Sequence, residues 1–191
     1  MAFVFHTATL EPGKLELIEA WLPSQPWFPG GSVARIAGAY RFDDPAGEVG
    51  LEGQLVQLGD GSIVHAPLSY RAAPLDGAET FLVGTTEHSA LGTRWVYDAS
   101  GDPVWATALA TAILIGATEA DIYYEMDGVQ QRRESRTKVQ GSGAPGTPVP
   151  DAGGLDLVVV RVVGFADEPF AETLTATWPG GGPAVVAGIR G

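Results

Sequence analysis

The chain has 191 residues and no cysteine, and its 11 basic side chains are outnumbered by 23 acidic ones, which gives a formal net charge of −12. A chain of this length buries a core without disulfide or metal staples, and the lack of cysteine excludes a disulfide framework, an iron–sulfur cluster and a thiol nucleophile. Nucleic acids and anionic membranes select basic surfaces, so the negative charge argues against both as main partners.

Two helices and five strands are predicted in the first half of the chain. The first helix begins near Pro12, carries apolar side chains at helical spacing and stops at Pro23. The second follows the N-cap residue Asp102 and ends at Gly116, and it is apolar almost all round, so we expect it to be buried deeply or covered by a partner. The strands are β-rich runs between turn residues, at 32–42, 48–58, 62–71, 81–86 and 93–97.

The second half is predicted to be rich in strands. Residues 121–126 and 129–140 form a hairpin through Asp127-Gly128, and the Gly- and Pro-rich residues 141–154 fit a long exposed loop. Further strands are expected at 155–165, 173–178 and 184–189. Hairpin-linked neighbours favour an antiparallel sheet, so the predicted fold class is α+β with the helices packed on one face of the sheet.

The protein is expected to be cytoplasmic. The longest apolar stretch, at 104–115, is shorter than the roughly 20 residues that span a bilayer. The N-terminal residues also lack the basic region that precedes the apolar run of a signal peptide.

No motif of the sequence indicates a cofactor, a metal site or a catalytic residue. The stretch 141–146 matches G-x-G-x-x-G, but Thr147 and two nearby prolines follow it instead of the helix that a phosphate-binding loop needs, so we interpret it as a linker. The three histidines, His6, His65 and His88, lack metal-ligand spacing. We therefore predict no cofactor and no metal.

Two clusters of side chains are candidates for binding or interaction. Glu87 and His88 are predicted in a polar turn at 84–94, where they either converge as acid and base or belong to a structural loop. Aromatic residues surround the end of the first helix and the start of the second, and they either pack in the core or form a platform for a sugar or a partner. The candidate residues are Trp21, Trp27, Phe28, Glu87, His88, Arg94, Trp95 and Tyr97.

Two parts of the sequence resemble a known family. Residues 15–30 contain Trp-Leu-Pro-Ser-Gln-Pro-Trp-Phe and are similar to a segment near the N-terminus of actinobacterial maltokinases, where a helix ends in Trp-Leu-Pro-x-Gln-x-Trp. Residues 82–86 and 94–103 look like the closing part of the same N-terminal cap. The likeness covers residues 1–117, and we expect 118–191 to be a β-rich extension that packs with this cap-like unit as one compact domain.

The resemblance implies a cystatin-like fold, in which a curved antiparallel sheet packs with the two helices and is followed by further antiparallel strands. It implies no catalytic residue, because maltokinases carry their chemistry in a following kinase domain with a His-Gly-Asp loop. Here the histidines are followed by Thr7, Ala66 and Ser89. The resemblance therefore implies a stand-alone cap-like protein.

Three functions stay open at this point. The first is a non-catalytic interaction or regulatory protein linked to the metabolism of maltose, trehalose, glycogen or amino sugars, which associates with a sugar kinase or with itself. The alternative is a protein that binds a sugar or a sugar phosphate. A second alternative is a small enzyme that uses Glu87 and His88.

Overall fold

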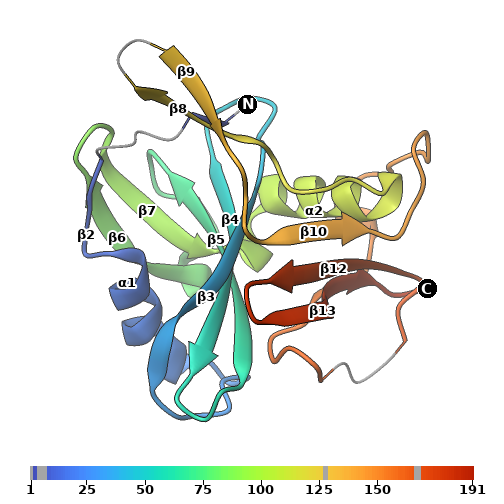
Figure 1. Cartoon of the computed structure of the whole chain (residues 1–191), viewed down its shortest axis with the longest axis horizontal. Coiled ribbons are helices and arrows are strands. Elements are labelled where there is room, and N and C mark those ends of the chain that lie inside the picture. Colours follow the sequence, from blue (N-terminus) through green and yellow to red (C-terminus); the bar gives the residue numbers. More distant parts are fainter. Residues whose placement is uncertain (1, 4–7, 127–128, 166–168) are drawn as a thin grey trace.

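The structure is a computed structural model, and it describes residues 2–3, 8–126, 129–165 and 169–191. Its largest element is a six-stranded antiparallel sheet that curls into half a barrel (Figure 1). In spatial order the strands are β2 (Leu10–Glu11), β6 (Leu82–His88), β7 (Gly92–Asp98), β5 (Ile63–Arg71), β4 (Gly50–Leu58) and β3 (Val33–Phe42). This sheet and its two helices confirm the predicted α+β class.

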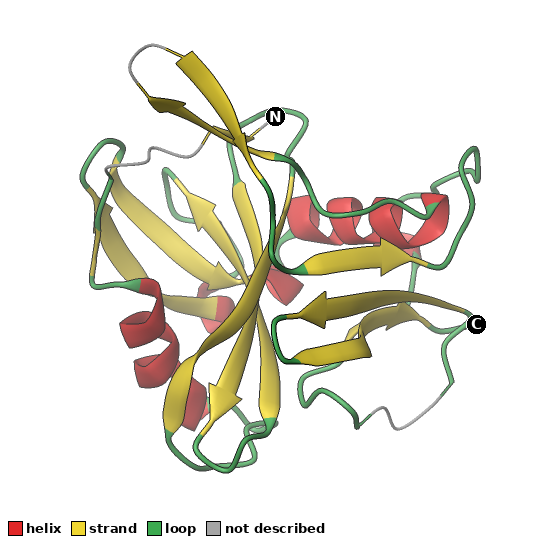
Figure 2. Ribbon diagram, viewed as in Figure 1, coloured by secondary structure: helices red, strands yellow, loops and turns green. Residues whose placement is uncertain are grey.

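The strands of the second half belong to two smaller sheets, one of which also includes β1 from the N-terminus (Figure 2). One has four antiparallel strands in the order β10 (Lys138–Gly141), β12 (Glu172–Trp178), β13 (Gly181–Ile189) and β11 (Leu157–Val159). The other has the order β1 (Ala2–Phe3), β8 (Ile122–Met126) and β9 (Val129–Arg133), with β1 parallel to β8. Short 3₁₀ turns lie at Leu22–Ser24, Glu79–Phe81, Ala99–Gly101 and Ala152–Gly154.

Each of the two helices packs against a different face of the six-stranded sheet. Alternate residues of β4 divide between two apolar cores, because successive side chains of a strand point to opposite faces. Val56 and Leu58 pack with α1 (Lys14–Trp21), on what we call the α1 face. Leu51 and Leu55 pack with α2 (Pro103–Ile115), on the α2 face. The expectation that both helices lie on one face was therefore wrong.

Helix α2 is covered by its own chain. Its side chains Trp105, Leu109 and Ile113 are buried, and they share a core with Leu174 of β12 and Val186 of β13. The four-stranded sheet thus covers the apolar surface of α2. The helix was expected to be either buried deeply or covered by a partner, and the structure shows that it is buried.

A buried histidine links the six-stranded and four-stranded sheets. The ring of His65 on β5 lies 3.0 Å from the Tyr40 hydroxyl through Nε2 and 3.0 Å from the Val186 carbonyl through Nδ1. Since a carbonyl only accepts hydrogen bonds, Nδ1 donates to Val186 and Nε2 accepts from Tyr40. A backbone hydrogen bond also joins β5 to the second half of the chain, from His65 N to the Arg161 carbonyl at 2.8 Å.

The second half departs from the prediction in two places. The expected strand 129–140 is divided into β9 and β10, which belong to different sheets, and the expected strand 155–165 shrinks to β11. The predicted hairpin of β8 and β9 is confirmed by their antiparallel pairing, while its turn, Asp127-Gly128, lies outside the described residues.

The G-x-G-x-x-G stretch caps the carboxyl end of α2. Gly143 N donates to the Ile113 carbonyl at 2.9 Å and Ala144 N to the Leu114 carbonyl at 3.1 Å. A Cβ at Gly143 would overlap the Leu114 carbonyl, so this close approach requires glycine. Amides that are bound to carbonyls are not available to a phosphate, which agrees with the interpretation of this segment as a connection.

Candidate binding site

A pocket of about 540 Å³ opens on the α1 face of the six-stranded sheet. Its lining comes from both edges and the middle of the sheet, so it lies on the concave side of the curl. Ligand pockets in proteins generally measure about 300–1,000 Å³, and this one is large enough for a sugar-sized molecule. The lining residues are Ala8, Leu10, Lys14, Arg41, Phe42, Asp43, Asp44, Gly47, Glu48, Val49, Gly50, Glu52, Tyr70, His88, Leu91 and Arg94.

Strand alternation explains why polar side chains reach this pocket. Glu52 and Gln54 lie on the same face of β4 as the apolar residues Val56 and Leu58. Helix α1 covers the apolar part of that face and leaves the polar part beside the pocket. The α1 face is therefore a core at one end and a polar pocket at the other.

Glu52 is the most deeply buried charge in the pocket, with 5 % of its surface exposed. Lys14 Nζ lies 2.6 Å from Oε2, Arg41 Nη1 lies 3.3 Å from Oε1, and the Gln54 amide donates to Oε2 at 2.8 Å. Burial alone would raise the pKa of Glu52, but the charges of Lys14 and Arg41 hold it below its usual value. The carboxylate is thus ionised and carries two cationic partners.

Several polar groups beside Glu52 have hydrogen-bonding capacity that the described residues leave unused. The buried atoms Arg41 Nε, Gln54 Oε1 and Arg94 Nε have no described hydrogen-bond partner. The Tyr70 hydroxyl lies close enough to Glu52 to lower the pKa of that carboxyl and so already interacts with it. Buried polar groups are normally paired, so this concentration of unpaired ones marks the pocket as a place for a polar ligand.

Arg94 and His88 form another part of the pocket lining, on β7 and β6. Arg94 Nη2 donates to the Leu91 carbonyl at 2.6 Å, and the backbone N of Ala90 donates to His88 Nδ1 at 3.1 Å. Burial, followed by the charge of Arg94, lowers the pKa of His88. The imidazole is therefore neutral at pH 7 and can bind a hydroxyl group.

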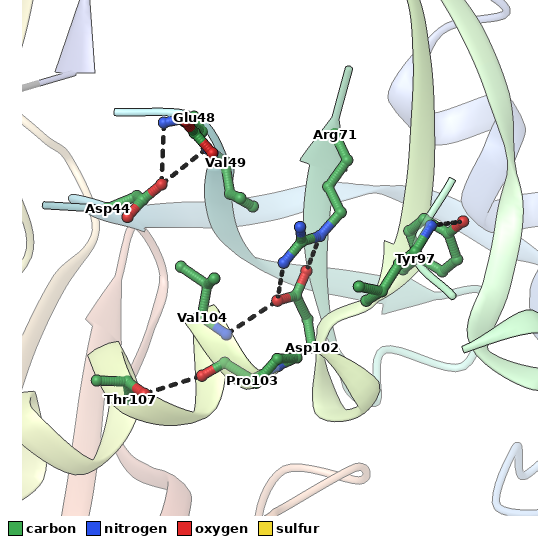
Figure 3. A network of polar contacts seen from close by, with 10 residues as sticks. Asp44, Glu48, Val49, Arg71, Tyr97, Asp102, Pro103, Val104 and Thr107 are labelled. Atoms are coloured by element: carbon green, nitrogen blue, oxygen red, sulfur yellow. Dashed lines mark hydrogen bonds and ion pairs between the residues drawn. The ribbon is translucent and has the colours of Figure 1, made fainter. Parts of the chain in front are cut away.

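The acidic side of the pocket includes a carboxylate with a structural role. Asp44 accepts hydrogen bonds from the backbone N of Ala46, Glu48 and Val49 at 3.0, 2.9 and 2.9 Å, and Figure 3 shows two of these. These donors use most of its acceptor capacity and fix the turn between β3 and β4. Glu48, in contrast, is an exposed residue of the lining.

The predicted pair of Glu87 and His88 does not converge. Both residues belong to β6 instead of a turn, so their side chains leave the sheet on opposite faces. His88 lines the pocket, whereas Glu87 is exposed and accepts a hydrogen bond from Thr93 Oγ1 at 2.6 Å. This geometry gives no support to an acid–base pair, and the hypothesis of an enzyme that uses these two residues loses its basis.

The aromatic candidates near α1 pack within the protein. Trp21 is buried, and its ring meets that of Trp27 edge to face at 5.6 Å between centroids. The guanidinium of Arg161 lies 4.6 Å from the Trp27 ring centroid and so covers one face of that ring, while Phe28 packs against the α1 core. These three residues are thus engaged by the chain itself and do not form an open platform.

The candidates on β7 divide between the two faces of the sheet. Arg94 points to the pocket, and the alternation of the strand directs Trp95 and Tyr97 away from it. Tyr97 is buried, and its hydroxyl accepts from the backbone N of Leu75 at 2.9 Å. Of the eight candidate residues, His88 and Arg94 line the pocket.

Sequence reasoning missed the residues at the centre of the pocket, which are Lys14, Arg41, Glu52 and Tyr70. The available signal lies on one face of β4, where every second residue from Glu52 to Leu58 is first polar and then apolar. Without knowledge of which strands are neighbours, that signal did not connect the four residues.

A second polar cluster stabilises the start of α2, and its Arg71 interacts electrostatically with Asp44 of the pocket lining. Asp102 is the N-cap of the helix and accepts from Val104 N at 2.9 Å (Figure 3). Arg71 binds the same carboxylate through two bonds, of 2.7 Å from Nε and 2.6 Å from Nη2. Burial would raise the pKa of Asp102, but the bonds from Arg71 lower it below its usual value.

Across the part of the chain that the structure describes, no group of three or more His, Cys, Asp and Glu residues has an arrangement that could hold a metal ion. Within the same residues, none of the helices has the length and apolar character needed to cross a bilayer.

The curled sheet, its two helices and the polar pocket belong to an α+β architecture. Residues 21–102 match the model of the maltokinase N-terminal cap domain. The matched segment runs from the end of α1 to the N-cap of α2 and includes β3 to β7. The resemblance inferred from the sequence is therefore confirmed for these residues, which are fewer than the expected 1–117. No curated protein matches the chain.

Proposed function

We propose that this protein is a non-catalytic, cap-like module of maltose or trehalose metabolism that associates with a sugar kinase. The observation that carries the proposal is the match of residues 21–102 to a domain named for its place at the N-terminus of maltokinase. The absence of a His-Gly-Asp sequence from the chain supports a role without phosphoryl transfer of its own.

A groove along α2 is the surface that we propose for this association. It measures about 570 Å³ and is lined by the outward side of α2, including Val104, Thr107 and Thr111, and by the turn that holds Pro45 and Ala46. Its position at the junction of the matched segment with α2 suits contact with a domain that follows a cap. The lining is small and mostly uncharged, which permits close approach of a partner.

The test is to mix the full chain with an intact maltokinase and to measure association by sedimentation velocity and the rate of maltose phosphorylation. We expect a complex with the wild-type chain. Thr107→Arg places a long charged side chain at the exposed part of the groove and should weaken the complex at least tenfold. Ala20→Arg, at an exposed position of α1, is the matched control and should have no effect.

Lack of association between the wild-type chain and the kinase, together with an unchanged phosphorylation rate, would contradict the proposal. Association that Thr107→Arg leaves intact would exclude the groove as the contact surface.

A second function, the binding of a small sugar-sized ligand, is favoured by the polar pocket on the α1 face. Its observation is the buried cluster of Glu52, Lys14 and Arg41 beside unpaired polar groups. Thermal-shift measurements with glucose, maltose, trehalose and glucose 6-phosphate test it, because a ligand at 100 times its Kd adds about 2.7 kcal/mol of stability.

The Tyr70 hydroxyl offers a matched pair of variants for this test. Tyr70→Phe removes a group in the pocket and should reduce the ligand-induced shift. Tyr123→Phe, on β8, removes an exposed contact of 3.3 Å with Asp121 and should leave the shift unchanged. Absence of a shift with all four compounds would remove this function.

A further inference from the structure

We infer that the ligand of the pocket carries an anionic group, a phosphate or a carboxylate, and that Arg94 and Arg41 bind this group. The inference rests on the second proposed function, the binding of a sugar-sized ligand, and it specifies the chemical class of that ligand. It follows from the distribution of charge within the pocket.

The group of charges around the buried Glu52 is net positive. Lys14 and Arg41 are both paired with the single buried carboxylate Glu52, so this group of three carries a net charge of +1. Arg94 adds another positive charge in the same lining. Three of the 11 basic side chains of an acidic protein thus converge on one pocket.

Arg94 is placed to accept an anionic partner. Among the described residues it makes no ion pair, and its one hydrogen bond, from Nη2, goes to the neutral carbonyl of Leu91. Its Nε is buried without a described partner. A guanidinium presents its donors as a planar fork that matches the two oxygens of a carboxylate or phosphate, so Arg94 has the chemistry that an anion site needs.

The acidic residues of the lining limit what kind of anion fits. Asp44 is engaged by three backbone donors, and Asp43 and Glu48 are exposed at the mouth of the pocket. Carboxylates at the mouth repel a bare anion but accept hydrogen bonds from hydroxyl groups. The arrangement therefore suits a polyhydroxylated molecule that places one anionic group inward and its hydroxyls outward.

His88 lies in the same lining on β6, the neighbour of the strand that carries Arg94.

The test is isothermal titration calorimetry of the full chain with glucose 6-phosphate, glucuronate, glucose and inorganic phosphate. We expect at least one of the two anionic sugars to bind tenfold or more tightly than glucose, and to weaken as the salt concentration is raised. Arg94→Gln should weaken that anionic sugar at least tenfold and weaken glucose much less. Arg136→Gln, at an exposed arginine outside the pocket lining, is the matched control and should bind like the wild type.

The outcomes separate the inference from the function on which it rests. Equal binding of glucose and both anionic sugars, with no effect of Arg94→Gln, would overturn the anionic ligand while the pocket stays a sugar site. Absence of binding by all four compounds would overturn both. Binding of inorganic phosphate that Arg94→Gln abolishes would support the anion site and show that the sugar body contributes little.

Discussion

His65 shows how one residue couples two sheets through its protonation state. It is fully buried, and both ring nitrogens are engaged, with Tyr40 and with the Val186 carbonyl. Burial, followed by the nearby charge of Arg161, lowers the pKa of His65 to about 3. The same burial raises the pKa of Tyr40, so the hydroxyl stays a donor.

The unfolding free energy should fall as the pH drops below about 6.5. An unfolded histidine takes up a proton near that pH, whereas folded His65 does so only near pH 3, so the unfolded state binds more protons between these values. The stability from this residue is complete above pH 6.5 and decreases by up to roughly 5 kcal/mol toward pH 3. Urea unfolding at several pH values measures this slope.

Two variants identify the source of this pH dependence. His65→Gln should lower the stability at pH 7.5 and flatten the slope between pH 6.5 and 4.5. His88→Gln should change the slope much less, because His88 is only half-buried. An identical slope in His65→Gln and in the wild type would show that other groups cause it.

Gly53 is a second residue whose identity is fixed by one contact. It faces Tyr40 across the strand pair β3–β4, and a Cβ at this position would overlap the Tyr40 ring. Gly53→Ala should therefore destabilise the protein by about 2 kcal/mol or more, as overpacking does. At Gly50 of the same strand the nearest atom to a new Cβ is at 3.4 Å, so Gly50→Ala should cost much less. Thermal unfolding of both variants decides this.

At the level of elements, the start of α2 depends on the buried ion pair of Arg71 and Asp102. Arg71→Met would leave the Asp102 carboxylate buried without its guanidinium, which should cost about 3 kcal/mol or more. Asp102→Asn keeps a good N-cap and leaves the more exposed Arg71 unpaired, so it should cost about 1 kcal/mol. Urea unfolding of both single variants and of the double variant measures the coupling.

The double variant provides the control for this prediction. Because it contains neither buried charge, it should be more stable than Arg71→Met alone. A double variant whose loss equals the sum of the two single losses would show that the pair is not coupled.

Elements with local signals were predictable, and their pairing partners were not. Asp102 and Gly116 mark the two ends of α2 through capping chemistry that lies within a few residues. The division of 129–140 into β9 and β10 has no such local signal. It depends on strand partners, because β9 pairs with β8, which precedes it, and β10 pairs with β12, which follows much later in the sequence.

The candidate site was predictable only in part for the same reason. His88 and Arg94 were proposed because they lie in a polar segment near each other in the sequence. Arg41 and Glu52 face each other across the β3–β4 pair, and Lys14 reaches Glu52 from α1, so the strand register and the docking of the helix bring the three together. The exclusion of a phosphate loop at 141–146 succeeded because it needed only the residues that follow it.

At the scale of the whole molecule, the two halves share one core. The core on the α2 face joins Leu55 and Trp105 from the first half with Leu174 and Ala187 from the second. Residues 1–117 alone should therefore remain poorly packed, with bound hydrophobic dye and a poorly dispersed amide NMR spectrum, whereas the full chain should show neither. A well-dispersed spectrum of the 1–117 fragment would contradict this prediction.

The late position of β12 and β13 in the chain has a consequence for synthesis on the ribosome. The side chains of Leu51 and Leu55 emerge long before residues 174–189, which cover them, have been made. At roughly 5–20 residues per second, this apolar surface stays bare for on the order of ten seconds. During that interval the nascent chain presents a surface of the kind that chaperones bind, so its yield in the cell should depend on chaperone capacity more than its final stability suggests.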